Sequence, residues 1–319
     1  MSRRGGPAAW IALASVCFFW GTTYLGIRIS IETLPPAFVI CARFILSGLI
    51  LLIAARIKGA HLPRGRDLRI ACFTGILILG IGNAAVFYAE EIIPSGLAGL
   101  FVTLLPFWMV GLEAAMGGEP LHTPGLFGMV VGFAGSVLLL TSGTGGSIRS
   151  MLLGFLIIEI GGIGWTIGSL IQRRQPTAAH PIVIGAVQQL AAGLLYIPVA
   201  AFVPAQPIIF SQRSVWALLY LVTFGSIVGY SAYIFAMDRL PVAIVSIYPY
   251  INGAVAVFLG WLFFREAFGI REFIGMLIIF AGVAIVKYRT PNTERQVLRA
   301  SRRGRMALVD DVRDSADSG

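Results

Sequence analysis

The chain has 319 residues, of which 57% are hydrophobic and only 12% are charged, and its mean hydropathy is +0.85. A soluble globule of this length could not bury so much apolar surface, so the composition indicates a protein dissolved in lipid. The net charge of +9 does not point to nucleic acid, because basic residues are not interleaved with aromatic ones and basic loops are attracted to anionic lipid.

Apolar runs follow one another along the chain, and each is long enough to cross a hydrocarbon core as a helix of about 20 residues. In chain order, the predicted spans are 8–27, 36–55, 68–89, 95–116, 124–140, 151–171, 181–203, 215–235, 241–264 and 270–286. Proline stands where four of these helices are expected to begin, at Pro36, Pro124, Pro181 and Pro241. The runs are too long for barrel strands, so the sequence predicts an all-α polytopic membrane protein with ten transmembrane helices.

Lys and Arg are unevenly distributed over the predicted loops, which sets the expected orientation. Most of them fall on one side of the membrane if the N-terminus is cytoplasmic, so both termini are expected to be cytoplasmic. Arg3 and Arg4 precede an apolar stretch without a clear cleavage site, which favours a retained first helix over a signal peptide. Residues 291–319 are polar and are expected to form a disordered cytoplasmic tail. The preference for Arg over Lys, with abundant Ala and Gly, points to a bacterial inner membrane.

One pattern is written twice in this chain. Glu119 and Glu266 are 147 residues apart, and the same shift carries Gly128 to Gly275 and Gly135 to Gly282. Further upstream a shift of 145 superimposes Trp20 on Trp165 and Gly48 on Gly193. The sequence therefore predicts two related units, 1–142 and 143–290, with five helices each. Because five is odd, the second unit must enter the membrane inverted, as in many secondary transporters.

Charged residues inside the predicted spans are the first candidates for substrate contact. Arg43 lies about 10 Å inside the boundary if its helix begins at Pro36, so it must face the interior of the bundle. It could contact a substrate carboxylate or be tied to backbone carbonyls. Glu159 is expected at nearly the same depth, where it could pair with a cation such as Arg43 or bind a proton for antiport. Glu90 and Glu91 are expected at a wet outer rim that could select cationic or zwitterionic solutes.

Amide and aromatic side chains complete the predicted substrate site. The amides of Asn83, Gln188 and Asn252 need partners within lipid, so they could join helices or bind a ligand. A cavity lined by rings could hold an aromatic or cationic group through stacking and cation–π contacts, although packing alone would also explain each ring. The aromatic candidates are Trp20, Tyr24, Tyr88, Trp108, Trp165, Tyr233 and Tyr250.

Several short motifs together resemble a known family. They are Trp20-Gly21, Ala42-Arg43-Phe44, Ala89-Glu90 leading to Pro94-Ser95-Gly96-Leu97-Ala98, Pro106 with Glu119, and the Gly-Phe-Ala-Gly of residues 132–135. This set resembles the EamA-type exporters of the drug/metabolite transporter superfamily over residues 8–290. The resemblance implies ten helices in two inverted repeats and export of amino acids, other metabolites or drug-like cations. The second copy departs from the first, with Gly253 in place of Pro106 and Gln188 in place of Arg43.

Other functions remain as alternatives. A polytopic membrane enzyme would need a nucleophile or a carboxylate cluster beside a base, and the sequence has neither. No metal site or cofactor is expected, because the three His fall in loops and the three Cys fall on separate spans. A channel would need rings of like residues. An exchanger of phosphate-bearing or sugar metabolites would be expected to carry more intramembrane Lys and Arg. The expected partners are lipid and a small solute, with a monomer possible; the solute, the direction and the energy source stay open.

Overall fold

The computed structural model describes residues 6–117, 123–141, 147–175, 177, 179–202, 207–240, 245 and 248–289. Within this part of the chain the secondary structure is helical and contains no strand. Arg3, Arg4, Glu119 and the tail 291–319, all of which carry expectations from the sequence, lie outside the described residues.

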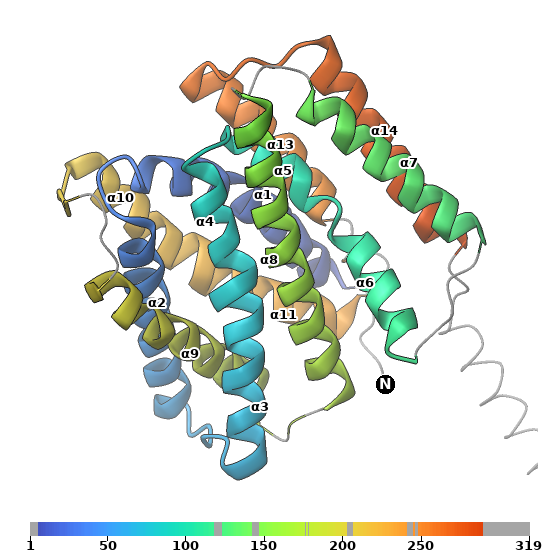
Figure 1. Ribbon diagram of the computed structural model, residues 1–319. Coiled ribbons are helices and arrows are strands. Elements are labelled where there is room, and N and C mark those ends of the chain that lie inside the picture. The colour runs from blue at the N-terminus through green and yellow to red at the C-terminus, as the bar shows by residue number, and fades with distance from the viewer. Residues whose placement is uncertain are drawn as a thin grey trace, which may run out of the picture.

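The helices form one bundle with a two-helix unit at its edge (Figure 1). In the first half they are α1 (Pro7–Ser30), α2 (Pro36–Ile57), α3 (Gly65–Gly75), η1 (Ile76–Asn83), α4 (Ala84–Glu90), α5 (Ser95–Val102), α6 (Leu105–Ala115) and α7 (Thr123–Leu140). In the second half they are α8 (Ile148–Arg174), α9 (Pro181–Phe202), α10 (Gln212–Tyr220), η2 (Leu221–Val228), α11 (Gly229–Arg239), α13 (Tyr248–Phe264) and α14 (Ile270–Arg289).

Eight helical stretches of the described chain are long and apolar enough to cross a membrane. They match the first eight predicted spans, usually with a few more residues at the ends. The ninth predicted span appears from residue 248 onward as the shorter apolar helix α13, of 17 residues. The tenth corresponds to α14, whose 20 residues carry Arg271 and Glu272 in the first turn. The chain is therefore a polytopic helical membrane protein.

Three spans are less regular than their apolar patterns predict. The third and eighth spans each contain eight residues of wider π-helix, at η1 and η2. The fourth span is divided between α5 and α6 at Thr103 and Leu104. Pro106 lies in the first turn of α6, where its missing N–H costs no helical hydrogen bond. Each irregularity lies beside the cavity described below.

Helices from the two halves pack against each other in matched pairs. α2 lies along α9, and α7 lies along α14 at the edge of the bundle (Figure 1). α1 packs against α10, η2 and α11, while α8 packs against α3, η1 and α4. α13 contacts both α5 and α1. The described helices are thus interleaved rather than gathered into two separate halves.

Glycines bring the paired helices into close contact. A Cβ at Gly282 would lie 2.5 Å from the backbone nitrogen of Gly132, so α14 and α7 touch through their main chains. A Cβ at Gly48 would lie 3.0 Å from the carbonyl oxygen of Ala186, and one at Gly193 would lie 2.9 Å from the nitrogen of Ile45. Small residues allow such close packing in membranes, where burial of apolar surface does not drive helices together.

Contacts between loops and helix ends occur at two opposite ends of the bundle. At one end Ile209 N donates to Thr33 O at 3.0 Å, and the Glu266 carboxylate accepts hydrogen bonds from Ser95 and Gly96. We call this the Ser95 end. At the other end Arg173 is 3.3 Å from Glu113, and Arg174 donates to Met116 O at 2.9 Å. Here Arg66 also reaches Gln175, at 3.3 Å.

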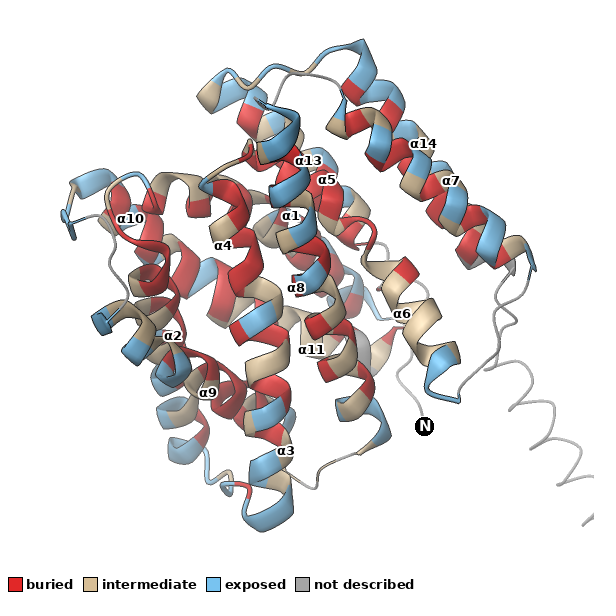
Figure 2. Cartoon of the chain, viewed as in Figure 1, coloured by how far each residue is buried: buried red, intermediate tan, exposed pale blue. Residues whose placement is uncertain are grey.

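Many residues on the outside of the bundle are exposed (Figure 2), and a large number of them are large apolar residues. Exposed examples from six helices are Ile53, Phe127, Ile160, Leu194, Trp216 and Phe258. The interior contains a continuous apolar cluster that includes Phe44, Phe87, Phe101 and Phe107, all nearly inaccessible. A surface this apolar on helices of spanning length is what lipid contact requires.

Candidate functional site

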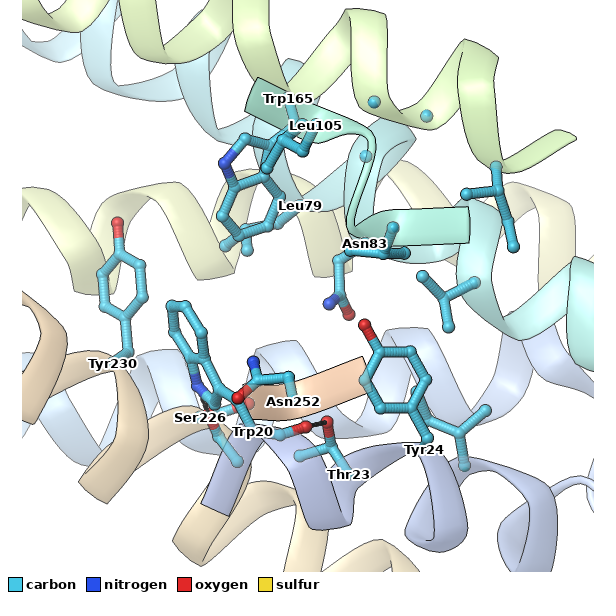
Figure 3. A pocket seen from close by; sticks show the side chains of 18 of the residues that line it. Trp20, Thr23, Tyr24, Leu79, Asn83, Leu105, Trp165, Ser226, Tyr230 and Asn252 are labelled. Carbon is cyan, nitrogen blue, oxygen red and sulfur yellow. Dashed lines mark hydrogen bonds between the residues drawn. The ribbon is translucent and has the colours of Figure 1, made fainter. Parts of the chain in front are cut away.

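A cavity lies in the middle of the bundle and is lined from both halves of the chain (Figure 3). Its walls come from α1, α2, η1, α4, α5 and α6 in the first half and from α8, α9, η2, α11 and α13 in the second. No residue of α7 or α14 lines it. The wall is mostly aromatic and aliphatic, with a few polar groups, which is the usual composition of a small-molecule site.

Eight of the residues predicted from the sequence line this one cavity: Trp20, Tyr24, Arg43, Asn83, Trp108, Glu159, Trp165 and Asn252. Arg43 and Glu159 are 4% and 6% exposed, so both charges are removed from bulk solvent. Both residues therefore face the interior of the bundle, as the sequence predicts for Arg43. Substrate contact by these eight residues stays a prediction.

Arg43 is held by neutral groups. Its Nε donates to Ser226 Oγ at 2.8 Å and its Nη1 donates to Asn83 Oδ1 at 3.4 Å. The guanidinium carbon lies 5.1 Å from the ring centre of Phe44 and 5.8 Å from that of Phe87, within cation–π range. Neither hydrogen bond neutralises the positive charge, so the guanidinium can still bind an anionic group in the cavity.

Glu159 is held by one hydrogen bond, donated by Trp108 Nε1 to Oε2. Its other oxygen, Oε1, is buried and has no hydrogen-bond partner among the described residues. The sequence favoured pairing or another structural role, with Arg43 as the suggested partner, but these two described side chains form no ion pair with each other. A guanidinium and a carboxyl group therefore line the same cavity, and each is hydrogen-bonded only to uncharged neighbours among the described residues.

Aromatic rings from both halves meet at the cavity. The ring centres of Trp20 and Trp165, which are equivalent positions of the repeat, lie 6.3 Å apart at an interplanar angle of 87°. Tyr248 packs edge-on against Trp20 at 5.1 Å. Trp20 Nε1 also donates to the carbonyl of Gly225 at 2.9 Å, which fixes its ring. Such rings supply flat apolar faces for a ligand with little loss of conformational freedom.

Asn252 acts mainly between helices. Oriented so that its nitrogen donates, its amide reaches the carbonyls of Tyr248 at 3.0 Å and Cys17 at 2.9 Å. It therefore ties α13 to α1 beside the cavity, one of the two roles expected for an intramembrane amide.

Five predicted site residues lie away from the cavity wall: Tyr88, Glu90, Gln188, Tyr233 and Tyr250. Tyr88 stacks on Tyr196 at 6.5 Å, Tyr233 packs against Trp20 at 5.2 Å, and Tyr250 packs against Phe280 at 5.6 Å. These three rings serve helix packing.

The expectation of a wet rim at Glu90 is wrong. Glu90 is fully buried, and Arg28 donates to its main-chain carbonyl. Glu91, the next residue, is exposed. Glu90 is the last residue of α4 and so turns into the bundle, while its neighbour faces outward.

Gln188 also lies outside the cavity, where its side-chain amide is hydrogen-bonded to residues of neighbouring helices. Its Nε2 donates to Thr74 at 3.0 Å and to Gln172 at 2.9 Å, and its Oε1 accepts from Tyr230 at 2.5 Å. The neighbouring Gln189 lines the cavity instead. Consecutive residues of a helix point about 100° apart. The repeat shift therefore identified the turn of α9 that borders the cavity, but it selected a residue on a side of that turn that does not line the cavity.

Sequence reasoning did not include several polar lining residues among the site candidates, notably Thr23, Gln189 and Ser226. Ser226 had no periodic signal, because it lies in the π segment η2. The clustering of Gly225, Ser226 and Gly229 was a usable hint, since small residues mark places where another group approaches a helix closely.

Other acidic residues have structural contacts. Glu113 forms an ion pair with Arg173. Glu266 accepts hydrogen bonds from Ser95 and Gly96 at the start of α5. The described residues include no group of three or more His, Cys, Asp or Glu side chains that could hold a metal ion.

Comparisons with known proteins agree with this geometry. Residues 8–141 and 152–288 each match the EamA-like transporter family. The chain is 32% identical over 286 residues to the uncharacterized inner membrane transporter YedA of Escherichia coli K12, covering 88% of this chain and 92% of YedA. It is 23% identical to the protein PecM of Dickeya dadantii, covering 84% of this chain and 88% of PecM.

A solved crystal structure has the same fold, with a TM-score of 0.64 at 20% identity, and the match covers 87% of this chain and 96% of the other. Both halves of the chain match one family, and the helical bundle with its central cavity is consistent with that match. This membrane protein belongs to the EamA-like transporter family.

Proposed function

We propose that this chain is a secondary transporter that exports small zwitterionic metabolites, amino acids above all, from the cell by alternating access. One observation carries the proposal: a single buried cavity is lined by Arg43 and Glu159, which are not paired with each other. Leaving two buried charges without an opposite charge is costly in a bilayer. A ligand that carries both charges would offset that cost.

The proposed binding mode assigns one end of the solute to each charge. Arg43 binds the carboxylate, because a guanidinium has five N–H donors and its described contacts use two of them. Glu159 Oε1 accepts from the ammonium group. Between them, Trp20, Trp108 and Trp165 provide faces for a side chain, so aromatic amino acids are a natural fit and the range is broad.

Alternating access would come from two inverted units of five helices, 1–142 and 143–290, giving ten spans. The two family matches support the duplication. Contacts at the two ends of the bundle support the inversion: Ser95 at the start of α5 meets Glu266 at one end, and Glu113 on α6 meets Arg173 at the other. The Lys and Arg bias of the loops supports an orientation with both termini in the cytoplasm and the Ser95 end outside. The printed name of YedA supports an inner-membrane location.

Drug-like cations form a second candidate class. Glu159 beside Trp108 offers one buried carboxylate in an aromatic wall, which would attract an amine without needing Arg43. Such a solute would leave the Arg43 charge unmatched, so we expect it to bind more weakly than a zwitterion.

The test uses purified protein in liposomes, with flux of radiolabelled amino acids and matched amines measured with and without a pH gradient. We expect saturable, protein-dependent flux of zwitterions. Arg43→Gln, which installs the residue found at equivalent position 188, should raise KM by about tenfold to a hundredfold, the value of a charge-assisted hydrogen bond. The variant Arg149→Gln, which makes the same change at an exposed position of α8 outside the cavity, is the matched control. Absence of protein-dependent flux for all solutes would contradict the proposal.

A further inference from the structure

The two π segments are built in the same way. η1 covers Ile76–Asn83 and η2 covers Leu221–Val228, so each residue of one corresponds to a residue of the other at a shift of 145. π turns inside helices are uncommon and cluster at functional sites. In both segments the equivalent glycine carbonyl accepts a side-chain hydrogen bond from the other half of the chain, from Trp20 to Gly225 and from Tyr196 to Gly80, each at 2.9 Å.

Arg43 hydrogen-bonds to both segments. Its Nε meets Ser226 in η2 and its Nη1 meets Asn83 at the end of η1. Gly225 makes the approach possible, because a Cβ there would lie 3.0 Å from Arg43 Nη2. The guanidinium therefore bridges two segments that lie far apart in the sequence and on opposite halves of the repeat.

We propose that Ser226 and Asn83 are positioning residues for substrate recognition: they hold the Arg43 guanidinium between the two π segments in the orientation that binds the substrate carboxylate. This inference rests on the proposed function. Both residues line the cavity, and both act on recognition through Arg43.

The chemistry of the contacts supports this role. A carboxylate binds a guanidinium best through two parallel hydrogen bonds, which require the planar group to keep a fixed orientation. Ser226 and Asn83 are neutral acceptors, so they fix the plane while leaving the positive charge for the ligand. An acidic residue in either place would compete with the substrate.

The same contacts link recognition to the helices that form the cavity. A carboxylate that binds Arg43 is also linked to η1 and η2, because the guanidinium is hydrogen-bonded to a residue of each segment. The third and eighth spans, one from each half, are thus connected to the ligand through one side chain.

The test compares Ser226→Ala with wild type in the liposome assay. We expect the KM for phenylalanine to rise about tenfold, the loss expected when one hydrogen bond to a charged group is removed, while Vmax stays within about twofold. Ser226→Cys keeps the size and offers a weaker acceptor, so its KM should lie between the two. The control is Ser136→Ala, which removes a buried serine of α7 away from the cavity.

A second measurement separates positioning from general packing. Phenylalanine methyl ester keeps the ring and the ammonium group but has no carboxylate, so its inhibition constant should be the same for wild type and Ser226→Ala. Equal losses for acid and ester, an unchanged KM, or a fall in Vmax alone would each overturn the role of Ser226. If wild-type protein moves no amino acid, the proposed function itself fails, and the two failures are thereby distinguished.

Discussion

Replacing Glu266 by Gln tests how strongly the loop before α14 holds the start of α5. The Glu266 carboxylate accepts from Ser95 N and Ser95 Oγ, both at 2.8 Å, and from Gly96 N at 2.9 Å. It thus caps the first turn of a helix from the other half of the chain. A negative charge there is also favoured by the helix dipole.

The expected cost follows from these three bonds. Glutamine keeps one acceptor oxygen, which can still serve Ser95, but it loses the charge and turns an NH₂ group toward the Gly96 N–H. Losing one charge-assisted hydrogen bond costs about 1.5–3 kcal/mol, and Glu266 is half-buried, so we expect about 2 kcal/mol. For a chain of 319 residues, with an unfolding entropy of about 2.1 cal/mol/K per residue, that corresponds to a fall in Tm of about 3 °C.

Thermal unfolding of the purified protein in detergent measures this effect, with Glu91→Gln as the control because Glu91 is exposed near the same end of the bundle. A Tm for Glu266→Gln within about 1 °C of wild type would show that the carboxylate does not hold α5, and would refute the reasoning.

Three further predictions concern the cavity and the paired helices. Trp108→Phe keeps an aromatic side chain but removes the indole N–H that donates to Glu159. We expect the KM for amino acids to rise about fivefold with a similar Vmax, and an unchanged KM would contradict this prediction. Glu159→Gln should abolish the preference for an ammonium group, so that an amino acid and its N-acetyl derivative compete equally in the flux assay; a retained preference would remove Glu159 from the site. Gly282→Val places a side chain where a Cβ would already lie 2.5 Å from Gly132 N, so it should separate α14 from α7. We expect a lower yield of folded protein on size-exclusion chromatography. A wild-type yield would show that the two helices can separate without loss of folding.

The membrane spans could be predicted from the sequence because each is set by a local property. An apolar run of about 20 residues has to form a helix in lipid, where its own backbone satisfies the hydrogen bonds. Arg43 and Glu159 could be placed in the interior for a related reason, since a charge at that depth cannot face lipid. Gly128 and Gly282 lie where α7 and α14 touch, although in the sequence they indicated only the repeat.

The finer features depend on tertiary contacts and carry weaker sequence signals. Nothing periodic distinguishes a π segment from the regular helix around it, so Ser226 was overlooked as a partner of Arg43. Glu90 was expected to be wet because it ends a span, but its side of α4 faces the bundle and is buried, whereas Glu91 is exposed. Gln188 was chosen by its position in the repeat, but α9 is oriented so that Gln189 lines the cavity instead.

The most direct test of the account is the topology of its two halves, because alternating access needs them inverted. Reporter fusions after Leu140 and after Phe264 should both report the outer side, and fusions after Ile57 and after Ala115 should both report the cytoplasm. Fusions after Ala115 and after Phe264, at equivalent ends of the fourth and ninth spans, would then disagree with each other, as inversion predicts. If those two fusions report the same side, the halves are not inverted and the account is contradicted.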